Sequence, residues 1–346
     1  MIARSHVTLE DVAQVASVSL ATASRVLNGT TNVREDLRER VLAAATDLDY
    51  TPNVHAQALA GAALRTVGVV CHDLGDPYFA AVVRGVLRAA DRNGLLVLLT
   101  DTFRDPDKEI AAVSTLRSQR ASVILLAGSA FEDRAWERAL AAELEPYRRG
   151  GGQVAVLGRH RNLKADSVRP ENRAGAKALA DALLGLGHRR FAVLTGPRTM
   201  TTVLDRITGF AEGLAGAGIE LSERDVFEGA FSRDGGHAAA TELVAAKHRA
   251  TCVFAVNDQM ALGAMTALRE AGHSIPGDVS VAGFGDIPVA RDLGPALTTV
   301  ALPLEELGEQ ALELALSGGR GGRSRVRRVA GEVVLRESTA RTRRRR

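Results

Sequence analysis

The sequence has little cysteine and no long apolar run. Only two of its 346 residues are cysteines, Cys71 and Cys252, and their wide spacing excludes both a disulfide framework and a cysteine-based zinc motif. Apolar stretches such as 94–99 and 123–127 are far shorter than the roughly 18 residues that a membrane span needs. The first residues show no apolar core followed by a cleavage site, so we expect a cytoplasmic protein that does not engage a membrane.

The motifs of several enzyme classes are also missing. No glycine-rich loop lies between a strand and a helix where it could cradle a phosphate, and neither GxSxG nor HExxH occurs. Cys71 and His72 are adjacent, so on a strand they would face opposite sides and make a poor nucleophile–base pair. We therefore expect no enzymatic activity, and we identify no catalytic residue, cofactor or metal site.

An excess of positive charge is found only in the C-terminal tail. The net charge is +3, but residues 317–346 alone carry +9, which leaves −6 on residues 1–316. Residues 1–65 hold six arginines against seven acidic residues. Bulk charge therefore gives no support to nucleic-acid binding, and placed groups would have to carry any such function.

Helical periodicity fills the first 50 residues. Thr8 can cap a helix whose apolar face runs from Leu9 to Ala16, and Ser19 can cap a second helix over 20–27. A third helix places Leu37, Val41, Ala45 and Leu48 on one side. These features predict a small all-α domain over residues 1–52, with a helix-turn-helix from about Thr8 to Asn28. Such a domain has little core, so we expect it to act as one of a pair.

From Thr66 onward, apolar strands alternate with amphipathic helices. The expected strands are 67–71, 95–100, 122–127, 154–158, 191–195, 253–256 and 279–284. Continuous apolar strands between helices indicate parallel sheets covered on both faces. The spacing repeats over about 66–159 and 166–284, so residues 66–340 predict an α/β core of two doubly wound parallel-sheet lobes, with a ligand cleft between them. We expect 317–328 to be a loop, 332–336 a last strand and 341–346 a basic tail.

The second helix carries side chains that suit DNA. In a helix-turn-helix this helix enters the major groove, and Arg25 could pair with the O6 and N7 atoms of a guanine. Leu20 and Ala21 could touch thymine methyl groups. Four short polar residues suit phosphates, which position a protein without reading sequence: Ser19, Thr22, Ser24 and Asn28. On spacing alone, an ordinary helical hairpin with a solvated arginine is an equal alternative.

Several longer segments resemble one family. They are VTLEDVAQVASVSLATASRVLNG, VGVVCHDLGDPYF, LGHRRFAVLTGP, DRITGF, VFAVNDQMALGAM and VSVAGFGDIPVARDLGPALTTV. In order and spacing they are similar to the lac repressor (LacI/GalR) family of bacterial regulators. The resemblance implies a periplasmic-binding-protein-like core and a ligand-responsive, DNA-binding transcriptional regulator. It favours a homodimeric repressor of carbohydrate-related genes, with a palindromic double-stranded operator and a sugar-like effector as partners.

The resemblance also assigns roles to single residues. Residues 53–65 correspond to the hinge helix and linker, in which Leu59 matches a leucine that wedges into the minor groove with Ala56 beside it. Five residues match effector contacts between the lobes: Tyr78, Phe79, Arg206, Phe231 and Asn257. Planar apolar faces and hydrogen-bonding groups of this kind suit a polyhydroxyl ligand.

The chain departs from the family pattern at three places. Gly285 replaces an aspartate that often binds a ligand hydroxyl in the family, which leaves Asp286 as a weaker candidate contact. Ser17 lies where glycine or asparagine is usual in the turn, and Arg34 replaces an N-capping serine. Two alternatives follow. One is a plain solute receptor, which the N-terminal helix-turn-helix argues against; the other is a DNA-binding protein that has lost its ligand response.

Overall fold

Residues 7–27, 33–50, 66–161, 163–318 and 324–342 are described by a computed structural model, in which the chain divides into two units, Met1–Arg65 and Thr66–Arg346. The predictions for Asn28, for the hinge segment 53–65 with Ala56 and Leu59, and for residues 343–346 of the basic tail lie outside these ranges.

In its described residues, 7–27 and 33–50, the first unit contains three helices, α1 (Leu9–Val15), α2 (Leu20–Leu27) and α3 (Glu35–Asp47). The predicted cap at Thr8 is confirmed: its hydroxyl accepts a hydrogen bond from the Asp11 amide at 3.3 Å, and the Asp11 carboxylate accepts one from the Thr8 amide at 2.8 Å. The buried core is small and consists mainly of alanine and valine, including Val12, Ala23 and Val41. So little buried apolar area gives the unit modest stability of its own.

The turn between α1 and α2 contains Ser17, one of the departures from the family pattern, and the predicted cap Ser19. Ser17 takes a φ of 51°, in the left-handed region that disfavours residues with a side chain. The Ser19 hydroxyl accepts from the Thr22 amide at 3.2 Å, which makes Ser19 the cap of α2. The Arg40 guanidinium of α3 donates to the Ala16 and Ser17 carbonyls, the latter at 3.2 Å. This arginine fixes the turn from a third helix, and its role was not predicted.

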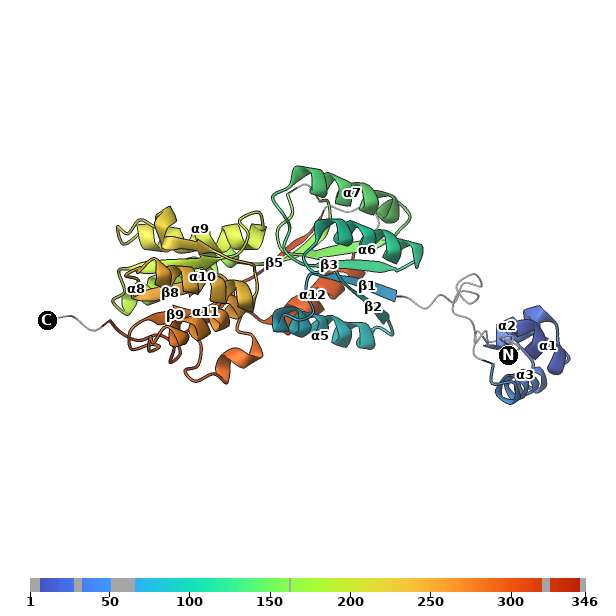
Figure 1. The fold of residues 1–346 in the computed structure, drawn as a ribbon. Coiled ribbons are helices and arrows are strands. Elements are labelled where there is room, and N and C mark those ends of the chain that lie inside the picture. The colour runs from blue at the N-terminus through green and yellow to red at the C-terminus, as the bar shows by residue number, and fades with distance from the viewer. Residues whose placement is uncertain (1–6, 28–32, 51–65, 162, 319–323, 343–346) are drawn as a thin grey trace, which may run out of the picture. The chain divides into compact units, whose positions relative to one another are not determined.

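The first lobe of the second unit is built on a parallel six-stranded sheet (Figure 1). Its order is β11 (Val326–Val329), β5 (Asp166–Pro170), β4 (Gln153–Leu157), β3 (Val123–Ala127), β1 (Thr66–Cys71), β2 (Leu96–Asp101). Helices α5 (Pro77–Arg92) and α12 (Leu304–Leu316) pack on one face, and α6 (Pro106–Ser118) and α7 (Arg134–Arg149) on the other.

The second lobe repeats this plan around a parallel four-stranded sheet. Its order is β7 (Val226–Glu228), β6 (Phe191–Thr195), β8 (Cys252–Ala255), β9 (Ser280–Ala282). Helices α8 (Asn172–Gly185) and α9 (Thr201–Ala215) pair with each other, as do α10 (Arg233–Ala245) and α11 (Asp258–Glu270). A small antiparallel sheet pairs β10 (Thr299–Ala301) with β12 (Glu332–Val334). The predicted fold class, with two doubly wound lobes, is confirmed, and none of the described helices is both long and apolar enough to cross a membrane.

The lobe boundary and the tail were predicted incorrectly. The second lobe was expected to begin near Asp166, but the strand that starts there pairs with β4 in the first sheet. The segment 317–328 was expected to be a loop, yet Val326–Val329 pairs with β5 as the sheet's last strand. This edge strand reads VRRV and is largely exposed, so it lacks the apolar run that predicts a buried strand.

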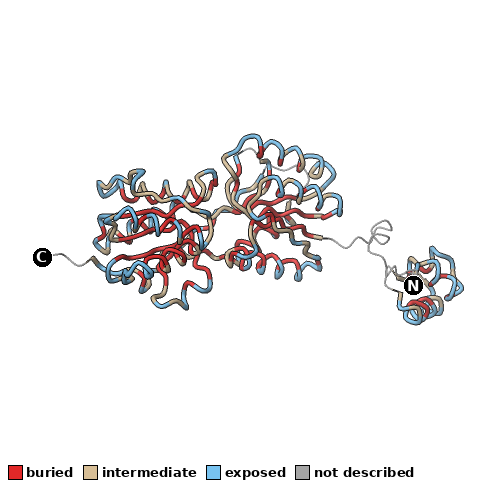
Figure 2. The backbone as a smooth tube through the Cα atoms, viewed as in Figure 1, coloured by how far each residue is buried: buried red, intermediate tan, exposed pale blue. Residues whose placement is uncertain are grey.

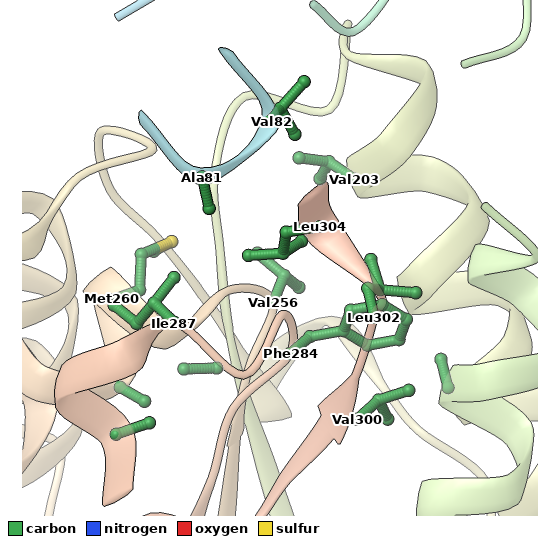
Figure 3. Close-up of a cluster of buried hydrophobic side chains, with 14 of the residues drawn as sticks. Ala81, Val82, Val203, Val256, Met260, Phe284, Ile287, Val300, Leu302 and Leu304 are labelled. Atoms are coloured by element: carbon green, nitrogen blue, oxygen red, sulfur yellow. The ribbon is translucent and has the colours of Figure 1, made fainter. Parts of the chain in front are cut away.

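A continuous apolar core joins the two lobes. Figure 2 shows buried residues along the strands and the inward sides of the helices of this unit. In Figure 3, Leu302 and Leu304 lie on the segment that leads back into the first lobe, with Val82 of α5, Val203 of α9 and Phe284 after β9 around them. The lobes therefore share packing near this crossing segment rather than meeting only through polar contacts.

Candidate functional site

One surface of α2 brings together most of the residues predicted to read DNA. Ala23 and Val26 face the core, whereas Ala21 and Arg25 are exposed and Leu20 is 45% exposed. Thr22 and Ser24 lie at the margin of this surface. The Ser19 and Thr22 hydroxyls also hydrogen-bond to each other at 2.9 Å. The amphipathic pattern therefore exposes the predicted base-reading side chains, while the small apolar side chains pack in the core.

A cavity opens at the point where the strand order of each parallel sheet reverses. In the first sheet β1 lies between β2 and β3, and in the second β6 lies between β7 and β8, so successive connections leave on opposite faces. Ligands of such sheets bind at the carboxyl ends of strands at this point. The cavity encloses about 690 Å³ of empty space, including its open mouth, and residues that follow strands of both lobes line it.

Arg206 is the central cation of this cavity. It comes from α9 and is 3% exposed; its Nε donates to the Asn172 side-chain oxygen at 3.0 Å and its Nη1 to the Val256 carbonyl at 2.7 Å. The guanidinium lies 3.9 Å from the centre of the Phe284 ring. Burial lowers its pKa to about 10, so it remains charged at neutral pH. Its Nη2 makes no hydrogen bond to the described part of the chain, which leaves one fixed donor for a ligand.

Asn257 and Asp258 bring complementary groups from the start of α11. The Asn257 side-chain oxygen caps the helix by accepting from the Met260 amide at 2.7 Å, while its Nδ2 is buried without a hydrogen-bond partner among the described residues. Asp258 accepts from the Thr299 hydroxyl at 2.6 Å and from the Ile287 amide at 2.9 Å. Burial raises the pKa of Asp258 to about 6. A buried amide donor without a partner is unfavourable unless a ligand or water accepts from it.

Aromatic side chains supply the apolar walls. Tyr78 and Phe79 begin α5 and meet edge to face at 5.1 Å, and both line the cavity, as does Phe231 after β7. Gly196 explains the place of Phe231, because a Cβ on this glycine would lie 2.6 Å from the ring's Cδ2 atom. The structure thus brings together five of the six predicted effector contacts: Tyr78, Phe79, Arg206, Phe231 and Asn257.

Asp286 is the predicted contact that the structure does not bring to the cavity. Its carboxylate pairs with Arg291 at 2.8 Å and with Arg336 at 2.6 Å. Burial opposes it, but the hydrogen bonds from these two arginines hold the pKa of Asp286 below its ordinary value. Gly285 before it has a φ of 136°, a conformation that strains any residue with a Cβ. The expectation for Asp286 is corrected on this geometry, since both of its oxygens are engaged by arginines away from the lining.

Six polar residues of the cavity lining were missed: Asp76, Ser129, Asn172, Thr202, Asp258 and Gln259. Asp76 caps α5 by accepting from the Tyr78 amide at 3.0 Å, and burial raises its pKa. A signal for it was present, because an aspartate before proline at a helix start is a typical cap. Asp258 could have been found beside Asn257 at the end of an expected strand. Asn172 carried no such signal, since its role depends on Arg206 from another helix.

Neither thiol offers chemistry here. Cys71 and Cys252 are both fully buried, and burial raises the pKa of Cys71 to about 12 and that of Cys252 well above its ordinary value. Both therefore stay protonated at neutral pH and behave as small apolar residues. In the described ranges, no three His, Cys, Asp or Glu side chains are placed to hold a metal ion.

Comparison with known proteins places both units. Residues 8–53 match the bacterial regulatory proteins of the lacI family, and residues 180–339 match a periplasmic binding protein-like domain. The transcriptional regulator GalS of Salmonella typhimurium is 36% identical over 321 residues, 91% of each chain. A lac repressor dimer bound to operator and an anti-inducer superposes with a TM-score of 0.83 at 28% identity, over 97% of this chain and all of that one. A ribose-bound regulator from Enterococcus faecium gives a TM-score of 0.72 at 28% identity, over 81% of this chain and all of that one.

Proposed function

Because the chain belongs to the LacI family of bacterial regulatory proteins, we propose that it represses carbohydrate-related genes in response to a sugar-like effector. As a member of that family it is a DNA-binding transcriptional regulator with an effector-binding domain. The relatives compared above are regulators rather than enzymes, and we extend this to the present chain, which we expect to act in the cytoplasm without catalysis.

DNA recognition is assigned to the exposed surface of α2. Arg25 is the long donor there, so it reads a guanine, while Leu20 and Ala21 contact thymine methyl groups. The phosphate contacts are Ser19, Thr22, Ser24 and Asn28. Ala56 and Leu59 keep the minor-groove role that the family resemblance gives them. Since residues 1–65 are not basic overall, these placed groups and pairing of two domains must supply the affinity.

The observation that carries the effector assignment is the buried Asn257 amide, which has no hydrogen-bond partner among the residues that the structure describes, in a cavity that Arg206 also lines. The two donors suit hydroxyl or ring oxygens. Asp258 has lone pairs left on both oxygens after its two hydrogen bonds, so it can accept from hydroxyl groups. Phe79 and Phe231 offer faces to the C–H side of a ring. A neutral polyhydroxyl compound fits these groups best.

A homodimer is supported by the edge of the first sheet, where no further strand of the described residues pairs with β2. β2 ends that sheet, and its Leu96 and Leu99 are 50% and 40% exposed. Unpaired, apolar edge strands promote association. We propose that two copies meet along this edge and so present two α2 helices to a near-palindromic operator whose half-sites lie about one helical turn apart. In sedimentation, the double variant Leu96→Lys and Leu99→Lys should be monomeric.

Effector binding acts through the lobes. A ligand held by groups of both lobes favours one angle between them, and the operator-binding segments of the dimer respond to that angle. The sign of the coupling free energy between effector binding and operator binding decides whether the ligand is an inducer or a corepressor.

Genome-wide footprinting of the protein on its own DNA tests the proposal first, because the genes beside bound sites nominate the ligand class. Binding of labelled operator is then measured with and without a panel of sugars and nucleosides that includes D-ribose and cellobiose. Operator binding that changes with one of these sugars supports the proposal. A response to nucleosides alone would replace the carbohydrate assignment, and tight operator binding without any response would favour a regulator that has lost its ligand.

A further inference from the structure

Arg104 connects the two lobes beside the cavity without lining it. It follows β2 in the first lobe, and its guanidinium carbon lies 6.0 Å from the centre of the Phe79 ring and 5.6 Å from that of Phe231. Phe79 belongs to the first lobe and Phe231 to the second. Distances of this size place the cation within reach of both ring faces.

The first lobe holds the guanidinium in place. Nη1 pairs with the Asp73 carboxylate, and Nη2 lies 3.3 Å from Asp76 Oδ2. The side chain is only 18% exposed, so this charge is largely shielded from water. Both carboxylates lie on the loop between β1 and α5. Arg104 is therefore anchored to its own lobe by ion pairs, and the aromatic contact with Phe231 is what it offers to the other lobe.

The backbone directs this side chain at a conformational cost. Phe103 and Arg104 have φ values of 53° and 59°, two consecutive left-handed residues that are not glycine. The Phe103 amide donates to Asp101 at 2.9 Å and the Arg104 amide to the His72 carbonyl at 2.8 Å, which fixes the turn. Phe103 consequently points outward, 69% exposed, while Arg104 points inward. Strained backbone of this kind is typical of functional positions.

Phe231 is confined by this arrangement. Its ring rests against Gly196, where a Cβ would lie 2.6 Å away, and it also faces the Arg104 cation. Since Phe231 lines the cavity, whatever fixes the ring fixes one wall of the site.

We propose that Arg104 is a positioning residue of the effector cavity. Through its contact with the Phe231 ring it biases the angle between the lobes before any ligand binds. The inference rests on the proposed function only in treating the cavity as the effector site. Removing the contact between Arg104 and Phe231 should change the ratio of the two arrangements of the lobes, which differ in the angle between them, about fivefold. This is the range expected for one partly shielded cation–aromatic contact. Arg159 and Asp205 link the lobes separately at 3.0 Å, so the lobes should shift rather than come free.

The test measures the distance between the lobes in the full chain without effector or operator. Spin labels are attached through Ala139→Cys on α7 and Thr241→Cys on α10, both exposed positions, while the two native cysteines are buried. Labelled protein is diluted into unlabelled protein so that one protomer of a pair carries labels. Pulsed electron resonance then gives the distance distribution for the parent, Arg104→Ala, Phe231→Leu and the double variant.

Each single variant should broaden or shift the distance distribution. The double variant should add nothing further, since each single variant already removes the contact between the Arg104 guanidinium and the Phe231 ring. Arg117→Ala is the matched control: it breaks an ion pair with Glu143 inside the first lobe and should leave the distance unchanged. An unchanged distribution in Arg104→Ala, or effects that add in the double variant, would overturn the proposal. If Arg104→Ala fails to fold, Phe231→Leu tests the same contact with the ion pairs intact. No sugar or operator is used, so this outcome is independent of the test of the proposed function.

Discussion

Replacing Arg206 by alanine should separate effector binding from DNA binding. The variant loses the guanidinium Nη2, the fixed donor left for a ligand in the cavity. A hydrogen bond from a charged group contributes about 1.5–3 kcal/mol, so effector affinity should fall by about 10- to 150-fold. Operator affinity without effector should stay within about twofold of the parent, because Arg206 belongs to the second unit and the helix-turn-helix to the first.

The Arg206→Ala substitution should also change the free energy of unfolding. Asn172 and the Val256 carbonyl each lose a partner, at about 1–3 kcal/mol per unpaired group. Against this, the fall in the pKa of Arg206 from 12.5 to about 10 means that burial disfavours its charged form by about 3 kcal/mol, which the variant recovers. The two unpaired groups together cost about 2–6 kcal/mol, so the net change in unfolding free energy should lie between a gain of about 1 and a loss of about 3 kcal/mol, measurable by urea denaturation.

Titration calorimetry with the effector found in the panel measures the affinity, and gel mobility shift measures operator binding. Arg173→Ala is the control, since it removes an arginine from the exposed side of α8, where it pairs with Glu212. Such surface pairs contribute little, so the control should match the parent in both assays. Equal effector affinity in Arg206→Ala and Arg173→Ala would refute the role assigned to Arg206.

Arg25→Ala should relax the preference for one guanine in each half-site, by about 1–3 kcal/mol in a sequence-variant binding assay; an equal loss on all sequences would contradict base reading. Gly196→Ala should push Phe231 from its place and weaken effector binding in calorimetry, while operator binding stays as in the parent; unchanged effector affinity would count against the Phe231 wall. Asp258 has a pKa of about 6, above its ordinary 3.8, so it contributes stability below about pH 3.8 that is lost as the pH rises through 6, about 3 kcal/mol in total. Denaturation from pH 4 to 7 should show this loss in the parent and not in Asp258→Asn; parallel pH curves would contradict it.

Predictions from sequence succeeded where local pattern and physical cause coincide. Thr8 and Ser19 cap helices because a hydroxyl just before a segment of helical periodicity can accept from an amide of the first turn. The buried strands of both lobes follow from their apolar runs. Arg206, Phe231 and Asn257 were placed by family resemblance, since nothing local distinguishes a cavity residue from a core residue. Their convergence depends on strand order, which periodicity does not carry.

The failures arise from contacts between distant segments. The prediction for Asp286 followed from its place after Phe284 in the sequence, whereas Arg336, one of the two arginines that engage its carboxylate, lies 50 residues later in the chain. Strand β11 was missed because its pattern is polar and its partner, β5, lies about 160 residues earlier. Arg104 shows nothing in the sequence beyond an ordinary loop arginine; its meaning comes from a ring on the other lobe.

The return of α12 and β11 to the first lobe has a consequence for synthesis of the protein. On the ribosome the helix-turn-helix unit emerges complete and can fold early, whereas the first lobe lacks the helix that covers β3, β4 and β5 until Leu316 has left the exit tunnel. Most of the second lobe is made in between, but Ser338, which hydrogen-bonds to Val281 beside β8, comes only after β11. The helix-turn-helix unit is therefore synthesised well before the effector-binding unit is complete. Chains interrupted after β9 would expose the apolar face that α12 normally covers, and quality control should remove them.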